Sequence, residues 1–390
     1  MFEYISIFLL FLFLSYYYDM RGNKTDYNTW FKYCCIILIL FAGLRNGVGG
    51  DTVHYSARFE EWPTLFELFS GDINFSIASQ PLWFLMNCTL KSIWNDFTII
   101  QLVHAFIFNA LLFKYIRKMT DYPFMVLLFV YCMVWWNLNF EVMRESLCVV
   151  IYLNALLYLK EGLVRKYLMC CVPCVFIHYF AIIAIGATLI VSYISNKMLL
   201  LIVLITSILI SVIDTSFIFD NIVEIVSLFE DDALLLKAGG YIYSDVWGET
   251  SLNLRGIIVH IIFLLYPIII VLNLKDKPKK TIEFRIICLF IVFYILSQRI
   301  VILHRFLNYF WIPVILETIN YLYEYRIRKS IRFYYILFLL LSTAVGDIQE
   351  FYQPSEYDKK SGISYDYRYI PYTSIFEEPN SLRKSRYTYY

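Results

Sequence analysis

The segment LRNGVGGDTVHY, residues 44–55, gathers polar side chains directly after an apolar run. Its candidate binding or catalytic residues are Arg45, Gly47, Gly49, Gly50, Asp51, His54 and Tyr55. The glycines permit positive φ angles or a close approach to a ligand. Asp51 can orient Arg45 or take a proton from a hydroxyl group, and His54 can do the same nearer neutral pH. A glycine turn closed by an aspartate is the simpler interpretation of the same pattern.

Three further arginines lie at the ends of apolar runs, namely Arg144, Arg299 and Arg305. Arginine at the centre of a membrane helix costs at least about 2.5–3.5 kcal/mol, so each position needs a reason. A guanidinium group binds phosphate oxygens with two parallel hydrogen bonds and keeps its charge. A single such arginine usually extends to the membrane surface. Together with Arg45, four on one face favour phosphate binding.

Carboxylates and a histidine accompany these arginines. Glu141 and Arg144 are three residues apart, so a helix makes them neighbours, either as an ordinary ion pair or as part of a site. Glu145 adds a second carboxylate. His178 lies in the apolar string VFIHYF, where a backbone carbonyl often satisfies such a side chain.

Aromatic residues offer surfaces on which sugar rings can stack. The string HRFLNY puts His304 beside Arg305, with Tyr309 one helical turn later. A polar loop over residues 214–253 contains Tyr241, Tyr243 and Trp247. These residues are candidates for binding a glycan, although Tyr and Trp also form belts at membrane interfaces.

The composition predicts an integral membrane protein. Of the 390 residues, 60% are hydrophobic and 17% are charged, and the mean hydropathy is +0.61. A net charge of +1 argues against a nucleic-acid partner. Repeated apolar runs predict an all-α, polytopic fold with about 10–12 transmembrane helices. The first run lacks a cleavage pattern and is expected to be retained as a span.

The expected spans have the following bounds: 2–18, 31–46, 81–95, 97–116, 122–138, 143–159, 167–195, 198–213, 254–273, 282–300, 309–323 and 331–346. The stretch 167–195 is one tilted helix or two short helices that meet near His178. Basic loops at 21–32, 114–118, 160–166, 275–280 and 325–332 predict the cytoplasmic face. If 81–95 is re-entrant and does not cross the membrane, the basic loops before and after it both lie on the cytoplasmic side. Residues 1–346 form the expected transmembrane domain, and the tyrosine-rich tail 347–390 follows on the outer side.

Known soluble catalytic modules are absent from the sequence. It contains no HExxH string, no nucleotide-binding glycine loop and no dinucleotide fingerprint. We expect no metal and no cofactor. An enzyme of this kind must take its activated substrate from the membrane, which indicates a lipid-linked phosphate donor.

The chain resembles the EpsG/Wzy-like bacterial polysaccharide polymerases. Five strings carry this resemblance, in this order: LRNGVGGDTVHYSARF, FEVMRESLCVVIYLNALLYLKEG, VFIHYFAIIAI, LHRFLNYFWIP and RYIPYTSIFEE. The resemblance covers nearly the whole chain. The family elements fall on Arg45, Gly47, Gly49 or Gly50, Asp51, Tyr55, Arg144, Glu145, His178, Arg305, Tyr309, Pro371 and Tyr372. Two departures are the extra glycine in GVGGD and Glu145 where glutamine is usual.

The resemblance implies a polymerase of the bacterial cytoplasmic membrane that makes O-antigen, capsule or exopolysaccharide. Such an enzyme joins repeat units carried on undecaprenyl diphosphate at the periplasmic or outer face. It also implies a chain-length regulator and a flippase as partners. We expect the acceptor base to be Asp51, Glu141 or His178. Arg45→Ala and Arg305→Ala are each expected to abolish polymer at unchanged protein level.

Three rival functions remain. A flippase of the same lipid-linked units also places arginine in a cavity, but such transporters often show internal repeats, and none is evident here. A ligase that transfers finished polymer uses similar chemistry. A membrane acyltransferase is indicated by His178 alone.

Overall fold

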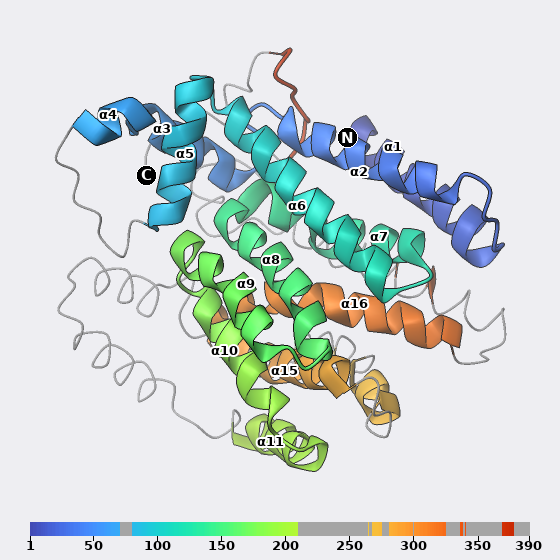
Figure 1. Cartoon of the computed structure of the whole chain (residues 1–390). Helices are drawn as coiled ribbons and strands as arrows, with labels where there is room; N and C mark the ends of the chain where they lie inside the picture. Colours follow the sequence, from blue (N-terminus) through green and yellow to red (C-terminus); the bar gives the residue numbers. More distant parts are fainter. Residues whose placement is uncertain are drawn as a thin grey trace, which may run out of the picture.

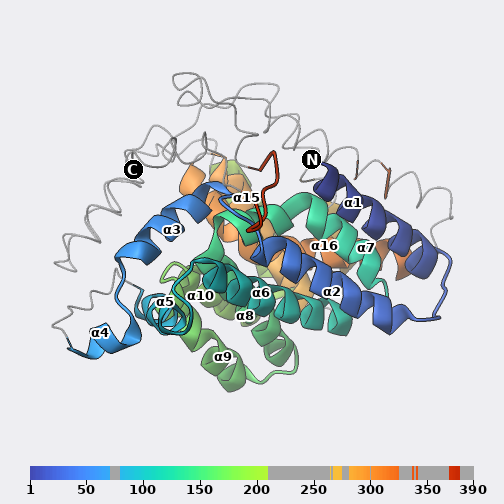
Figure 2. The ribbon, with the colours of Figure 1, turned by 90° about the horizontal axis from the view of Figure 1, so that it is seen from above.

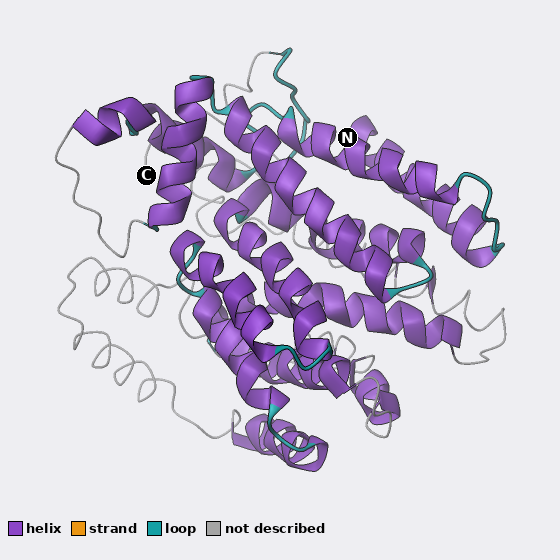
Figure 3. Ribbon diagram, viewed as in Figure 1, coloured by secondary structure: helices purple, strands orange, loops and turns teal. Residues whose placement is uncertain are grey.

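The structure is a computed structural model that describes residues 1–70, 80–209, 264, 267–274, 281–298, 300–324, 336–337, 340 and 369–377. Regular structure within these ranges is helical, and an isolated β-bridge joins Arg45 to Ser374 (Figure 3). The expected all-α class is confirmed.

The main elements, in chain order, are α1 (Phe2–Leu14), η1 (Ser15–Met20), α2 (Tyr27–Gly43), α3 (Gly50–Glu61), α4 (Leu65–Ser70), α5 (Pro81–Ile93), α6 (Thr98–Met119), α7 (Pro123–Val130), η3 (Tyr131–Trp135), η4 (Asn137–Glu141), α8 (Met143–Lys160), α9 (Val164–Ile177), α10 (Ala181–Ser192), α11 (Asn196–Leu209), α15 (Thr281–Ser297), η6 (Val301–Phe306) and α16 (Leu307–Glu324). The predicted spans at 81–95, 97–116 and 143–159 match α5, α6 and α8 within a few residues.

The described helices have the apolar character of a membrane protein. The stretches Phe2–Met20 and Thr98–Met119 are long and apolar enough to cross a bilayer, and α2, α10 and Pro123–Trp135 are shorter apolar helices. Large apolar side chains such as Phe2, Phe13 and Ile190 are exposed on the outside of the bundle, where lipid would cover them. The total number of spans stays a prediction.

Helix α8 is the centre of the bundle. It packs against α6, α9 and α16, which lie on different sides of it (Figure 1). Most of its side chains are buried, as expected for a helix that is apolar all round. The polar residues at its first turn are therefore held by packing on every side.

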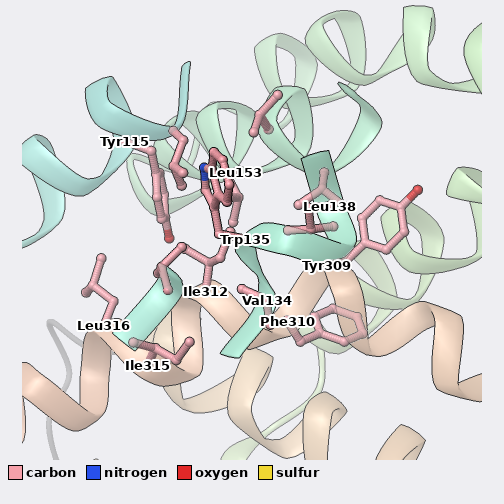
Figure 4. Close-up of a cluster of buried hydrophobic side chains, with 14 of the residues drawn as sticks. Tyr115, Val134, Trp135, Leu138, Leu153, Tyr309, Phe310, Ile312, Ile315 and Leu316 are labelled. Carbon is pink, nitrogen blue, oxygen red and sulfur yellow. The ribbon is translucent and has the colours of Figure 1, made fainter. Parts of the chain in front are cut away.

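The chain enters α8 through irregular helix. The widened π-helical turns η3 and η4 follow α7 and end at Val142, whose φ of −98° and ψ of 55° are not helical. Trp135 and Leu138 from these turns pack with residues of α8 and α16 in the buried cluster of Figure 4. This packing fixes where α8 begins.

The long apolar stretch 167–195 forms two helices, which resolves the alternative left open by the sequence. Helix α9 contains Pro173 and ends at His178, whose backbone is extended with φ −154° and ψ 100°. Helix α10 starts at Ala181. The break points His178 toward the first turn of α8 and away from a regular helical position.

Part of the expected tail docks on the helical domain. Residues 369–377 lie along the end of α2 and the loop after it (Figure 2). The backbone N–H of Asn46 donates to Thr373 O at 2.8 Å, and Ile375 N–H donates to Leu44 O at 2.9 Å. The Tyr372 ring stacks on Phe41 with ring centroids 4.6 Å apart. The end of the chain thus supports the loop that carries Arg45.

Gly49 is required by close packing between this loop and η4. Its φ is +99°, and an added Cβ would lie 2.4 Å from the carbonyl oxygen of Phe140. We expect Gly49→Ala to lower thermal stability in detergent, because such strain costs about 1–3 kcal/mol. Gly186→Ala is the matched control, since a Cβ there meets nothing within 4 Å. An unchanged Tm for Gly49→Ala would contradict this description of the loop.

Candidate active site

The first turn of α8 places two charged side chains at one end of this central helix. Arg144 is half-buried and Glu145 is buried. The N-terminal end of a helix carries partial positive charge, so a carboxylate in the first turn is favoured there.

Arg144 holds two neighbours from the segment after α2. Its Nε donates to the hydroxyl of Tyr55 at 3.2 Å, and its guanidinium carbon lies 5.3 Å from the centre of the Tyr55 ring. Its Nη1 donates to Oε1 of Gln80 at 2.7 Å. Tyr55 comes from α3, and Gln80 is the residue that precedes α5. Three elements therefore meet at this guanidinium group.

His178 and Glu145 face each other next to Arg144. The side-chain amide of Gln80 lies 3.4 Å from Nδ1 of His178. On the other side of the ring, Nε2 lies 3.8 Å from Oε2 of Glu145. The second oxygen of Glu145 accepts a hydrogen bond from Asn308 Nδ2 at 3.0 Å. The carboxylate is thereby oriented by α16 while it faces the histidine.

A small pocket opens beside this pair. It is lined by Glu145, His178, Phe180, Ile302, Arg305, Phe306 and Tyr309. Tyr309 is buried, and its hydroxyl has no hydrogen-bond partner among the described residues. In Figure 4 that hydroxyl points away from the apolar cluster beneath it. The pocket combines a cation, a carboxylate, an imidazole and a phenol, which suits an anionic substrate that also carries a hydroxyl group.

Arg45 lies elsewhere and is fully buried. Its guanidinium group donates to the carbonyl oxygens of Val48, at 3.2 Å, and Ala42, and to Thr52 Oγ1 at 3.2 Å. Its guanidinium carbon also lies over the Phe140 ring, 5.0 Å from the ring centre. Direct binding of phosphate by Arg45, as the sequence predicts, requires a guanidinium group that the phosphate can reach. The structure instead places Arg45 where it joins the loop 44–50 to η4.

The remaining predicted residues are spread around these two centres. Gly47 and Gly49 have positive φ angles in the Arg45 loop. Gly50 and Asp51 start α3, but the placement of their side chains is not described. Glu141 ends η4 and is buried, and His304 is exposed, outside the pocket lining. The following predicted residues lie outside the described residues: Tyr241, Tyr243, Trp247 and Arg299.

His54 is half-buried on α3, a polar helix outside the apolar spans. Burial lowers the pKa of this imidazole, and the nearby guanidinium groups of Arg58 and Arg144 lower it further. His54 is therefore neutral at physiological pH and can accept a hydrogen bond from a substrate hydroxyl.

The sequence did not single out Gln80 and Asn308, although both contact the candidate pair. Gln80 directly precedes Pro81 at the start of α5, a position that usually only marks a helix boundary. Asn308 is part of the string HRFLNY, but its neighbours Arg305 and Tyr309 offered the more obvious chemistry. Neither role can be inferred without knowing which helix ends meet.

The fold and the pocket define an all-α membrane protein with a charged site at the ends of its central helices. The EpsG family model matches residues 28–374, and the chain belongs to this family. Membership gives the protein a polysaccharide-polymerase type of role in general terms. No curated protein and no solved structure matches the chain.

The burial of Arg45 changes what its substitution should do. Arg45→Met leaves buried carbonyl oxygens without donors, at about 1–3 kcal/mol for each. We expect a clear fall in Tm in detergent, together with a lower protein level. Arg144→Met is the comparison, because Arg144 is only half-buried, whereas Arg45 is fully buried, and its Tm should change less. Equal Tm values for Arg45→Met and the wild type would contradict the structural role.

Proposed function

We propose that this protein polymerises a bacterial surface polysaccharide by transferring the growing glycan from undecaprenyl diphosphate to the next lipid-linked repeat unit. The supporting observation is the pocket at the first turn of α8, where Arg305 lies with Glu145 and His178. The reaction needs a cation for the diphosphate that leaves and a base for the hydroxyl group that attacks. The pocket offers both kinds of group within one small volume.

Arg305 and Arg144 are the proposed contacts for the diphosphate. Preorganised positive charge is most useful where negative charge develops in the transition state, and in this reaction that is the departing diphosphate. Arg299 and Asp51 retain their proposed roles in binding or catalysis, and the structure does not describe their side chains. Tyr55 and Tyr309 are the proposed aromatic contacts for the sugars.

The direction of α8 supports a site on the outer face. Its 18 residues span about 27 Å, close to the thickness of the hydrocarbon core. Arg144 and Glu145 lie at one end, and Lys160 at the other end pairs with Glu283 at 2.5 Å. Lys160 begins one of the basic loops that the positive-inside rule assigns to the cytoplasm. We propose that the protein resides in the cytoplasmic membrane and that its site faces the periplasm or exterior.

The lipid-linked oligosaccharide is the proposed donor and acceptor. A flippase would supply these units from the cytoplasmic side, and a chain-length regulator would set the product size. Both partners are part of the proposal. The polymerase, flippase and ligase functions differ in what reaches the cell surface when the protein is lost.

Arg305→Ala tests the proposal in a deletion strain complemented with each variant. We expect at least about a 100-fold loss of long polymer, because a charged contact to the leaving group is removed. Surface polysaccharide separated by size on a gel gives the readout, and immunoblotting gives the protein level. Single repeat units should still reach the surface.

Arg165→Ala is the matched control, because it removes the same charge from an exposed position on α9. It should leave the polymer ladder unchanged. A normal ladder with Arg305→Ala would remove Arg305 from the mechanism. Loss of all surface repeat units in the deletion strain would favour a flippase, and finished polymer kept on its lipid carrier would favour a ligase.

A further inference from the structure

Gln80 has an unusual backbone at a buried position. Its φ of 53° is in the left-handed region, which residues other than glycine rarely occupy. It is 3% exposed and directly precedes α5. Such strain persists where the surroundings determine the conformation, and it concentrates at functional sites. The side chain of Gln80 accordingly lies between two predicted site residues, Arg144 and His178.

The orientation of the Gln80 amide is determined by Arg144. A guanidinium group has only hydrogen-bond donors, so the atom that faces Nη1 at 2.7 Å must be the amide oxygen. The amide nitrogen therefore faces His178 Nδ1, at 3.4 Å. This nitrogen also has only donors, so Nδ1 must accept the hydrogen bond.

The tautomer of His178 follows. An Nδ1 that accepts a hydrogen bond carries no proton, so the proton of the neutral ring is on Nε2. Nε2 faces Oε2 of Glu145 at 3.8 Å, which is too long for a direct hydrogen bond. An oxygen atom in the adjoining pocket can lie within hydrogen-bond reach of both atoms.

We infer that Gln80 is a positioning residue that keeps His178 in the Nε2–H tautomer, so that Glu145 is the base of the glycosyl transfer. This inference rests on the proposed function. The acceptor hydroxyl receives a hydrogen bond from His178 Nε2–H and donates its own proton to Glu145 Oε2. Its oxygen forms a bond to the anomeric carbon of the donor sugar. The bond from that carbon to the diphosphate oxygen breaks, and its electron pair leaves with undecaprenyl diphosphate.

The opposite assignment conflicts with the contacts. If His178 were the base, its Nε2 would be unprotonated and its Nδ1 would carry a proton toward the amide nitrogen of Gln80. Two donors would then face each other. Turning the amide by 180° moves the conflict to Arg144, where the amide nitrogen would face a guanidinium N–H. One arrangement of protons therefore satisfies both contacts.

The tautomer can be measured without any assay of activity. Histidine labelled with ¹⁵N would be incorporated into the full-length protein in lipid nanodiscs. The chain has 5 histidines, and the His178 signals are identified by their loss in His178→Gln. We expect a neutral ring protonated on Nε2, and a shift toward the other tautomer or the imidazolium in Gln80→Glu, which cannot donate. A wild-type ring protonated on Nδ1 would overturn the inference.

Polymerisation activity of variants shows whether His178 acts as a hydrogen-bond donor or as the general base. A glutamine side chain can supply an N–H near the position of Nε2 but cannot accept a proton. We therefore expect His178→Gln to keep polymerisation within about tenfold of wild type, while His178→Ala and Glu145→Gln lose more than about 100-fold. Equal, complete loss in His178→Gln and Glu145→Gln would overturn the assignment of the base.

Failure of the inference is distinguishable from failure of the proposed function. If the wild-type protein makes no polymer, the proposed function fails, and the ¹⁵N spectrum still reports the tautomer. If the wild type is active and Glu145→Gln keeps full activity, Glu145 is excluded as the base. If Glu145→Gln does not fold, the spectrum of the wild type and Gln80→Glu still decides the role of Gln80.

Discussion

The scarcity of water inside the bundle is the constraint on which the rest of the structure depends. A charged or polar group buried there needs a partner from the protein, because leaving it unsatisfied costs several kcal/mol. At the first turn of α8 this requirement brings together α3, the start of α5, the break after α9 and the start of α16. Gln80 accepts a hydrogen bond from Arg144, and its amide nitrogen faces His178. Asn308 donates a hydrogen bond to Glu145. The same contacts that make burial tolerable also hold the groups in one orientation.

The loop after α2 meets the constraint in a different way. Arg45 donates to carbonyl oxygens of its own segment and to Thr52, and Thr52 in turn donates to Phe140 O at 3.0 Å. Residues 369–377 close the loop from outside. Arg45 therefore fixes the position from which α3 starts, and α3 delivers Tyr55 to Arg144. These contacts give Arg45 a structural role in the loop.

Much of the fold could be predicted because it follows from local patterns. Apolar runs gave the bounds of α5, α6 and α8 closely, and the polar His178 marked the break in a long apolar stretch. Chemical type also identified Arg144, Glu145, His178, Arg305 and Tyr309 as candidates that the structure brings together. The burial of Arg45 could not be predicted, because it depends on contacts with distant residues such as Thr373 and Ser374. The role of Gln80 depends on its left-handed backbone and on two partners from other helices, which no local pattern reveals.

The central claim is that this pocket transfers a glycan from one lipid diphosphate to another lipid-linked unit. Reconstitution of the purified protein in liposomes with lipid-linked repeat units, extracted from a host strain that lacks the gene, tests it most directly. The account predicts a ladder of longer lipid-linked glycans and the release of one undecaprenyl diphosphate for each bond formed. Movement of unchanged units across the bilayer, without a ladder and without released diphosphate, would contradict it.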